Sequence, residues 1–173
     1  MKKILIFLAF ALASCSSPTA LHTEIYRGKE ILVGKTTRQS LRQNPYAEWF
    51  EKNYEAYHPG KQITARLKPL INQYDFEIYM GTWCGDSRRH VPVFFKVIDQ
   101  SGYHKKPVIY TVPRKYKSYK PAQKKNIIRV PTFIVLKNGR EIGRIIEYPM
   151  ESIEKDLLKI IHGNYHHELQ NAR

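Results

Sequence analysis

The chain has 173 residues, of which 42% are hydrophobic and 25% charged, and its 29 lysines and arginines against 15 aspartates and glutamates give a formal net charge of +14. This length and apolar content suit one folded domain with an adequate core, and the absence of any internal repeat or biased segment excludes solenoid and low-complexity architectures. The basic balance favours acidic or anionic partners.

The start of the chain predicts export from the cytoplasm. Two lysines precede an apolar run from Ile4 to Ala13, which is the pattern of a secretory signal and is too short to span a bilayer. The residues LASC, ending at Cys15, resemble a bacterial lipobox, in which the cysteine becomes the lipid-modified first residue. The alternative is an ordinary cleavage site with an incidental cysteine. We expect a signal peptide over 1–14, a lipidated linker over 15–23, and a domain anchored by acyl chains to a membrane of the bacterial cell envelope.

Two helices are expected next. In residues 44–57, Asn44 is placed to cap a helix, Pro45 takes its first position, and five aromatic residues recur at helical spacing. Residues 60–73 predict a second helix, in which Pro69 marks a kink or an early end. We therefore expect residues 24–73 to form an N-terminal helical extension.

The rest of the chain predicts an α/β domain. Its expected elements are a strand over 75–81, a helix over 83–102 bent at Pro92, a strand over 107–112, a hairpin over 130–148 turning at Asn138-Gly139, and a helix over 150–163. Residues 164–173 read as a frayed tail. The expected order is therefore β-α-β, then a β-hairpin and a final helix, with further helices ahead of it.

Four features of this domain together resemble the thioredoxin family, in particular its members in the bacterial cell envelope. They are WCGDS at the turn from strand to helix, Pro92 eight residues after Cys84, the VPT of residues 130–132, and the KNGREIGR hairpin behind it. The resemblance implies an α/β thioredoxin-like fold over residues 74–163, in which helices flank a central mixed β-sheet. Residues 24–73 resemble only an N-terminal extension that some members of the family carry.

The resemblance also implies a site around Cys84. A cysteine at a helix N-terminus faces unsatisfied backbone N–H groups, which stabilise the reactive thiolate. In the family the bond corresponding to Val130-Pro131 is cis, and the backbone before the proline pairs with an incoming substrate strand beside the cysteine. Trp83 would form a flat apolar shoulder next to the sulfur, and the alternative of a packed core tryptophan is compatible with that role.

Two departures from the family pattern change the expected chemistry. Ser87 stands where dithiol members carry the second cysteine that resolves a mixed disulfide. Because lipid would consume Cys15, Cys84 would be the only free thiol, and Ser87 is expected to donate a hydrogen bond to its sulfur. Ile78 replaces an aspartate that many members bury, and Glu77 should point to the opposite face of its strand.

These residues leave two classes of function open. In the first, Cys84 performs monothiol exchange with protein thiols or disulfides, either shuffling disulfides or holding a partner's cysteine as a protective mixed disulfide, and an outside reductant is needed because the envelope is oxidising. In the second, a thioredoxin-like domain without catalysis binds a partner protein. No cofactor is implied in either case.

The positive charge gathers in one part of the sequence. Residues 100–140 contain eleven lysines or arginines and no aspartate or glutamate. Such a stretch suits anionic lipid headgroups or acidic proteins, or it is simply a solvated face. Nucleic acid is not an expected partner of an exported lipoprotein. The histidines at 162, 166 and 167 lack partnering ligands, so no metal site is expected.

Overall fold

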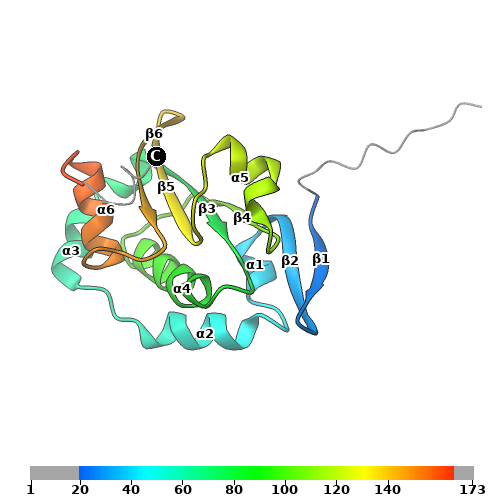
Figure 1. Cartoon of the computed structure of the whole chain (residues 1–173). Coiled ribbons are helices and arrows are strands. Elements are labelled where there is room, and N and C mark those ends of the chain that lie inside the picture. The colour runs from blue at the N-terminus through cyan, green and yellow to red at the C-terminus, as the bar shows by residue number, and fades with distance from the viewer. Residues whose placement is uncertain (1–19, 166–173) are drawn as a thin grey trace, which may run out of the picture.

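A computed structural model describes residues 20–165, which form one six-stranded sheet with helices on both faces (Figure 1). The strands are β1 (His22–Tyr26), β2 (Lys29–Thr36), β3 (Asp75–Met80), β4 (Val108–Thr111), β5 (Thr132–Lys137) and β6 (Arg140–Ile146). The helices are α1 (Arg38–Leu41), α2 (Ala47–Ala56), α3 (Lys61–Leu67), α4 (Gly85–Gln100), α5 (Lys120–Lys124) and α6 (Ile153–Ile161), with short 3₁₀ turns η1 (Ile71–Gln73) and η2 (Tyr116–Ser118).

The sheet has the order β1-β2-β4-β3-β5-β6. Strands β3 and β4 run parallel and are joined through α4, whereas every other neighbouring pair is antiparallel. A β-α-β unit followed by a β-hairpin and a final helix, all in one mixed sheet, is the arrangement expected from the sequence. The fold is therefore thioredoxin-like, with β1 and β2 added beyond β4.

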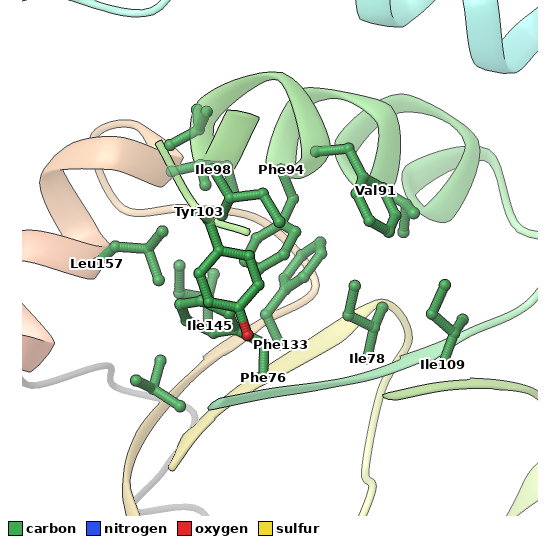
Figure 2. Packing of buried hydrophobic residues seen from close by; sticks show 14 of the residues in the cluster. Phe76, Ile78, Val91, Phe94, Ile98, Tyr103, Ile109, Phe133, Ile145 and Leu157 are labelled. Carbon is green, nitrogen blue, oxygen red and sulfur yellow. The ribbon is translucent and has the colours of Figure 1, made fainter. Parts of the chain in front are cut away.

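The alternation of side chains along β3 divides the core into two layers. Phe76, Ile78 and Met80 face the large cluster beneath α4, while Tyr79 belongs to a smaller cluster on the other face of the sheet. Figure 2 shows Phe94 of α4 directed at the phenylalanines of the sheet. Its ring lies 4.8 Å from that of Phe133 and 5.3 Å from that of Phe76. This aromatic contact fixes α4, and with it the turn that precedes α4, against β3 and β5.

Most predicted elements are confirmed. The strand over 75–81, the helix over 83–102 and the strand over 107–112 correspond to β3, α4 and β4, and Pro92 lies inside α4. The hairpin turns at Asn138-Gly139, where both residues have the positive φ angles that this turn requires. The helix over 60–73 ends early as α3.

Two local predictions are wrong. Asn44 does not cap α2, and Pro45 is not its first residue. The carbonyl of Gln43 accepts the N–H groups of Tyr46 and Ala47 in a preceding turn, so that the helix begins at Ala47 with Tyr46 as its cap.

The extension over 24–73 is also not helical throughout. It opens with the hairpin β1–β2, whose turn at Arg27-Gly28 has positive φ at both residues, and β2 extends the central sheet by pairing with β4.

The predicted signal peptide over 1–14, the predicted lipidation site at Cys15 and residues 166–173 of the predicted tail lie outside the described residues. Between residues 20 and 165, no helix has the length and apolar character to cross a membrane.

Candidate active site

Cys84 lies at the turn between β3 and α4, where it is the N-cap of the sixteen-residue helix α4. The side chain is partly exposed, and its Sγ donates a hydrogen bond to the carbonyl oxygen of Val130 at 3.3 Å. The Val130-Pro131 bond is cis, as expected. The structure therefore brings Cys84 against the segment before Pro131, although the two are 46 residues apart in sequence.

The backbone around Cys84 is held on both sides. Its N–H donates to the carbonyl of Gly81 at 2.9 Å, and its carbonyl accepts the N–H of Arg88 at 3.0 Å. The unsatisfied N–H groups of the first helical turn favour negative charge at this end of α4. Asp86 is the acidic residue of that turn and opposes this effect.

Ser87 has a different partner from the one expected. Its side chain is fully buried one turn into α4, and its Oγ accepts a hydrogen bond from the N–H of Gly81 at 3.2 Å. No hydrogen bond joins Ser87 to the sulfur of Cys84 in the described part of the chain. The serine thus stabilises the turn that carries Cys84, because it satisfies a buried backbone donor.

Trp83 forms one wall beside the cysteine. Its Nε1 donates to the carbonyl of Val112 at 3.0 Å, its ring stacks on Tyr116, and the guanidinium of Arg114 lies 4.5 Å from the ring centroid. Burial raises the pKa of Tyr116, and the nearby Cys84 and Glu147 add to this shift. The indole packs against the smaller core cluster and is also partly exposed, so both expectations for Trp83, an apolar wall next to the cysteine and a packed core residue, are compatible with its position.

Gly81 makes this position of the indole sterically feasible. A Cβ atom at residue 81 would lie 2.5 Å from Cε2 of Trp83, far inside van der Waals contact. Sequence reasoning did not single out this glycine, because its role depends on how Trp83 folds back over it.

The position of Ile78 is apolar, as its residue type implies. The side chain is fully buried in the core beneath α4. Glu77 points to the opposite face of the sheet, where its carboxylate pairs with Lys125 at 3.0 Å. Hence neither residue places a carboxylate beneath Cys84.

The β1–β2 hairpin contacts the turn that carries Cys84, which sequence reasoning did not anticipate. The N–H of Leu32 in β2 donates to Oγ1 of Thr82 at 3.0 Å, and Nε of Arg114 donates to the hydroxyl of Tyr26 at 3.3 Å. A cavity of about 220 Å³ lies between the hairpin and Trp83. The tight Arg27-Gly28 turn between two β-rich runs was the available signal for this hairpin.

The basic stretch is only partly neutralised by the fold. Lys105, Lys125 and Arg129 pair with carboxylates from other parts of the chain. Across residues 20–165, no group of three or more histidine, cysteine, aspartate or glutamate side chains is arranged to hold a metal ion.

Neither a protein-family model nor a curated protein matches the chain. Among solved structures, it is similar to a protein of unknown function from Pseudomonas aeruginosa, with 18% identity, 69% of this chain and 73% of the other covered, and a TM-score of 0.45. It is also similar to a thioredoxin pre-protein from Schistosoma mansoni, with 23% identity and a TM-score of 0.38, and the match covers 60% of this chain and 90% of the other. A third similar structure is mitochondrial thioredoxin 3 from Saccharomyces cerevisiae, with 19% identity and a TM-score of 0.37, and the match covers 64% of this chain and 97% of the other. Identities and TM-scores this low carry no inference about activity.

Proposed function

We propose that this protein performs monothiol exchange through Cys84 on other proteins of the bacterial cell envelope. A lipid on Cys15 would anchor it to a membrane of that envelope. The observation that carries the proposal is the position of the sulfur. Cys84 is a partly exposed residue at the N-terminus of α4, and its Sγ lies 3.3 Å from the backbone oxygen of Val130, next to Pro131.

The reacting form of Cys84 is the thiolate, because the thiolate and not the thiol is the nucleophile. The thiolate of Cys84 then attacks one sulfur of a substrate disulfide, so that a new Cys84–substrate disulfide forms and the other substrate sulfur leaves as a thiolate. The backbone of Val130 and the ring of Trp83 would hold the substrate segment on either side of the sulfur. The sulfur of Cys84 is oxidised and the leaving substrate sulfur is reduced, so this step consumes no outside oxidant or reductant.

Release of the substrate requires another thiol, because Ser87 cannot attack the mixed disulfide. A second thiolate of the same substrate would displace Cys84 and leave the substrate with a rearranged disulfide. A thiol reductant from outside would instead attack the Cys84 sulfur, so that the substrate leaves as a thiolate and Cys84 is joined to the reductant by a disulfide. A second molecule of the reductant would then release Cys84 as a thiolate and leave as the disulfide of the reductant. The chain is therefore suited to shuffling or protecting thiols and not to net reduction by a dithiol.

The experiment uses a peptide whose cysteine carries a pyridyl disulfide. In the full-length Cys15→Ser protein, Cys84 is the only thiol, so release of pyridinethione and the intact mass of the mixed disulfide report on it alone. We expect a stable one-to-one mixed disulfide, which an added thiol reverses. The Cys84→Ser, Cys15→Ser protein should give none. Absence of the adduct in the folded Cys15→Ser protein would refute the proposal.

A second candidate is a binding protein without catalysis. Two positions favour this candidate, because neither carries the group that a dithiol enzyme would use there. Ser87 instead accepts a hydrogen bond from the N–H of Gly81, and Ile78 packs in the core. This candidate predicts that partners recovered from envelope extracts are the same with Cys84→Ser as with the unaltered protein. Monothiol exchange predicts that partners linked through a reducible bond are lost from that variant.

A further inference from the structure

A basic cavity lies directly beside the turn that carries Cys84. It has a volume of about 220 Å³ and is lined by Tyr26, Arg27, Lys29, Ile31, Trp83 and Arg88. Three of these residues are cationic and none is acidic. Trp83 immediately precedes Cys84, and Arg88 follows it by one turn of α4. A group bound in the cavity would therefore lie next to a substrate attached to the sulfur.

The positive charges that line this cavity are not neutralised by carboxylates of the described residues. Arg27 and Lys29 are exposed at the hairpin tip and form no ion pair within residues 20–165. Nε of Arg88 donates to the carbonyl of Thr82 at 2.6 Å, which orients the guanidinium while its terminal nitrogens form no hydrogen bond to described residues. An oriented guanidinium fork is the arrangement that binds a carboxylate through two parallel hydrogen bonds.

Arg114 extends the positive region from the cavity toward Cys84. Its guanidinium lies 5.8 Å from the ring centroid of Tyr26 and 4.5 Å from that of Trp83. The hydrogen bond from Arg114, followed by the charges of Arg27 and Arg114, lowers the pKa of Tyr26, which indicates a positive potential at this edge of the cavity. Stacking on two aromatic rings also links the hairpin to the wall of the thiol site.

We propose that this cavity binds the carboxylate of an acidic residue close to the reactive cysteine of a polypeptide substrate. The proposal rests on the monothiol exchange proposed above and names the substrates it prefers. A polypeptide is favoured over a lipid surface because the cations converge on a concave site that shares Trp83 and Arg88 with the turn around Cys84. Arg88 and the hairpin residues Arg27 and Lys29 would approach the carboxylate from two sides.

The test compares reaction rates of matched peptides with the full-length Cys15→Ser protein. Each peptide carries one pyridyl-disulfide cysteine, and a single glutamate is moved through successive positions on either side, with glutamine peptides as partners. We expect the best glutamate peptide to react about fivefold faster than its glutamine partner, the size of a favourable, partly exposed charge contact. Added salt should reduce this preference.

Two double variants, both in the Cys15→Ser protein, locate the effect. Arg27→Gln with Lys29→Gln should bring the rate ratio close to one. Lys124→Gln with Arg140→Gln removes the same charge from exposed residues that do not line the cavity, and should leave the ratio unchanged.

Each outcome decides the matter. If the peptides react but glutamate gives no advantage at any position, the cavity proposal is wrong while monothiol exchange stands. An equal loss of preference in both double variants would also overturn it, because net charge alone would then explain the preference. If the preference is absent and the hairpin substitutions instead release the protein from phosphatidylglycerol vesicles, the cavity contacts lipid. If no peptide reacts, the proposed function fails, and the cavity proposal fails with it.

Discussion

The substitution Ser87→Cys tests whether the site lacks only a second thiol. Cys84 is the N-cap of α4 and Ser87 is the third residue of the helix. Side chains at these two positions face each other across the first turn, as capping-box hydrogen bonds demonstrate in other helices. We therefore expect Cys84 and a cysteine at position 87 to form a disulfide without any change in the path of the backbone.

The structure gives the size of two opposing effects on stability. In the reduced variant the N–H of Gly81 loses the hydroxyl that accepts its hydrogen bond, and leaving such a buried donor poorly satisfied costs about 1–3 kcal/mol. In the oxidised variant, closing a loop of about four residues restricts the unfolded chain and restores about 1.9 kcal/mol in the entropic account. The oxidised variant should thus be the more stable form by about that amount.

Urea unfolding of the oxidised and reduced forms measures this difference, and mass spectrometry after alkylation counts the free thiols. The protein carries Cys15→Ser throughout. In a peptide assay, the mixed disulfide should no longer accumulate, because the second thiol would displace the substrate.

Ser101→Cys is the matched control for this experiment. Ser101 is also fully buried, but it lies at the C-terminal end of α4, about 25 Å from Cys84 at the rise of a helix. It should never form a disulfide with Cys84. If Ser87→Cys stays folded with two free thiols after treatment with an oxidant, our account of the turn is wrong.

Three further predictions concern the scaffold. Phe94→Ala should lower the free energy of unfolding by about 3–5 kcal/mol in urea, because the ring joins α4 to β3 and β5, and Phe94→Leu should cost less. Gly81→Ala should displace the indole of Trp83 and alter tryptophan fluorescence, whereas at Gly85 an added Cβ meets nothing within 4 Å and the spectrum should not change. Burial and the nearby charge of Glu30 raise the pKa of Tyr46 to about 12, so its stabilising contribution is present below pH 10 and lost as the pH rises toward 12. Across that range, unfolding free energies should fall less steeply in Tyr46→Phe, by up to about 1.4 kcal/mol per pH unit, and equal slopes would contradict this.

The sheet from β3 to β6 was predictable because each of its signals is local. The runs that became β3 and β5 are apolar and end at residues that favour turns, and Asn138-Gly139 tolerates the positive φ angles of a two-residue hairpin turn. Cys84 and the cis Val130-Pro131 bond were placed by resemblance to a family motif. Their contact, although distant in sequence, followed from that resemblance.

The features that escaped prediction depend on contacts between distant segments. β1 is exposed along nearly its whole length, so it carries little apolar pattern, and the Arg27-Gly28 turn was the one local signal for the β1–β2 hairpin. The place of this hairpin in the central sheet is set by the pairing of β2 with the distant strand β4. Likewise, the start of α2 is set by a turn at Gln43 and not by the residue type at Asn44. The partner of Ser87 could not be read from sequence, because a hydroxyl can either donate to a side chain or accept from a backbone N–H, and the fold of the preceding turn decides which of the two it does.

The two departures from the dithiol pattern have become part of the scaffold, and this bears on what the site can do. At position 78 the fold gains a buried isoleucine in place of a carboxyl group whose burial would need a partner. At position 87 it gains a hydrogen bond that holds Gly81, and Gly81 in turn leaves the space that the indole of Trp83 occupies. The absence of a second cysteine therefore does not imply a collapsed site. Cys84 is partly exposed, with the packed ring of Trp83 next to it in the chain and the backbone acceptor of Val130 beside its sulfur, and these are the parts on which the proposed exchange depends.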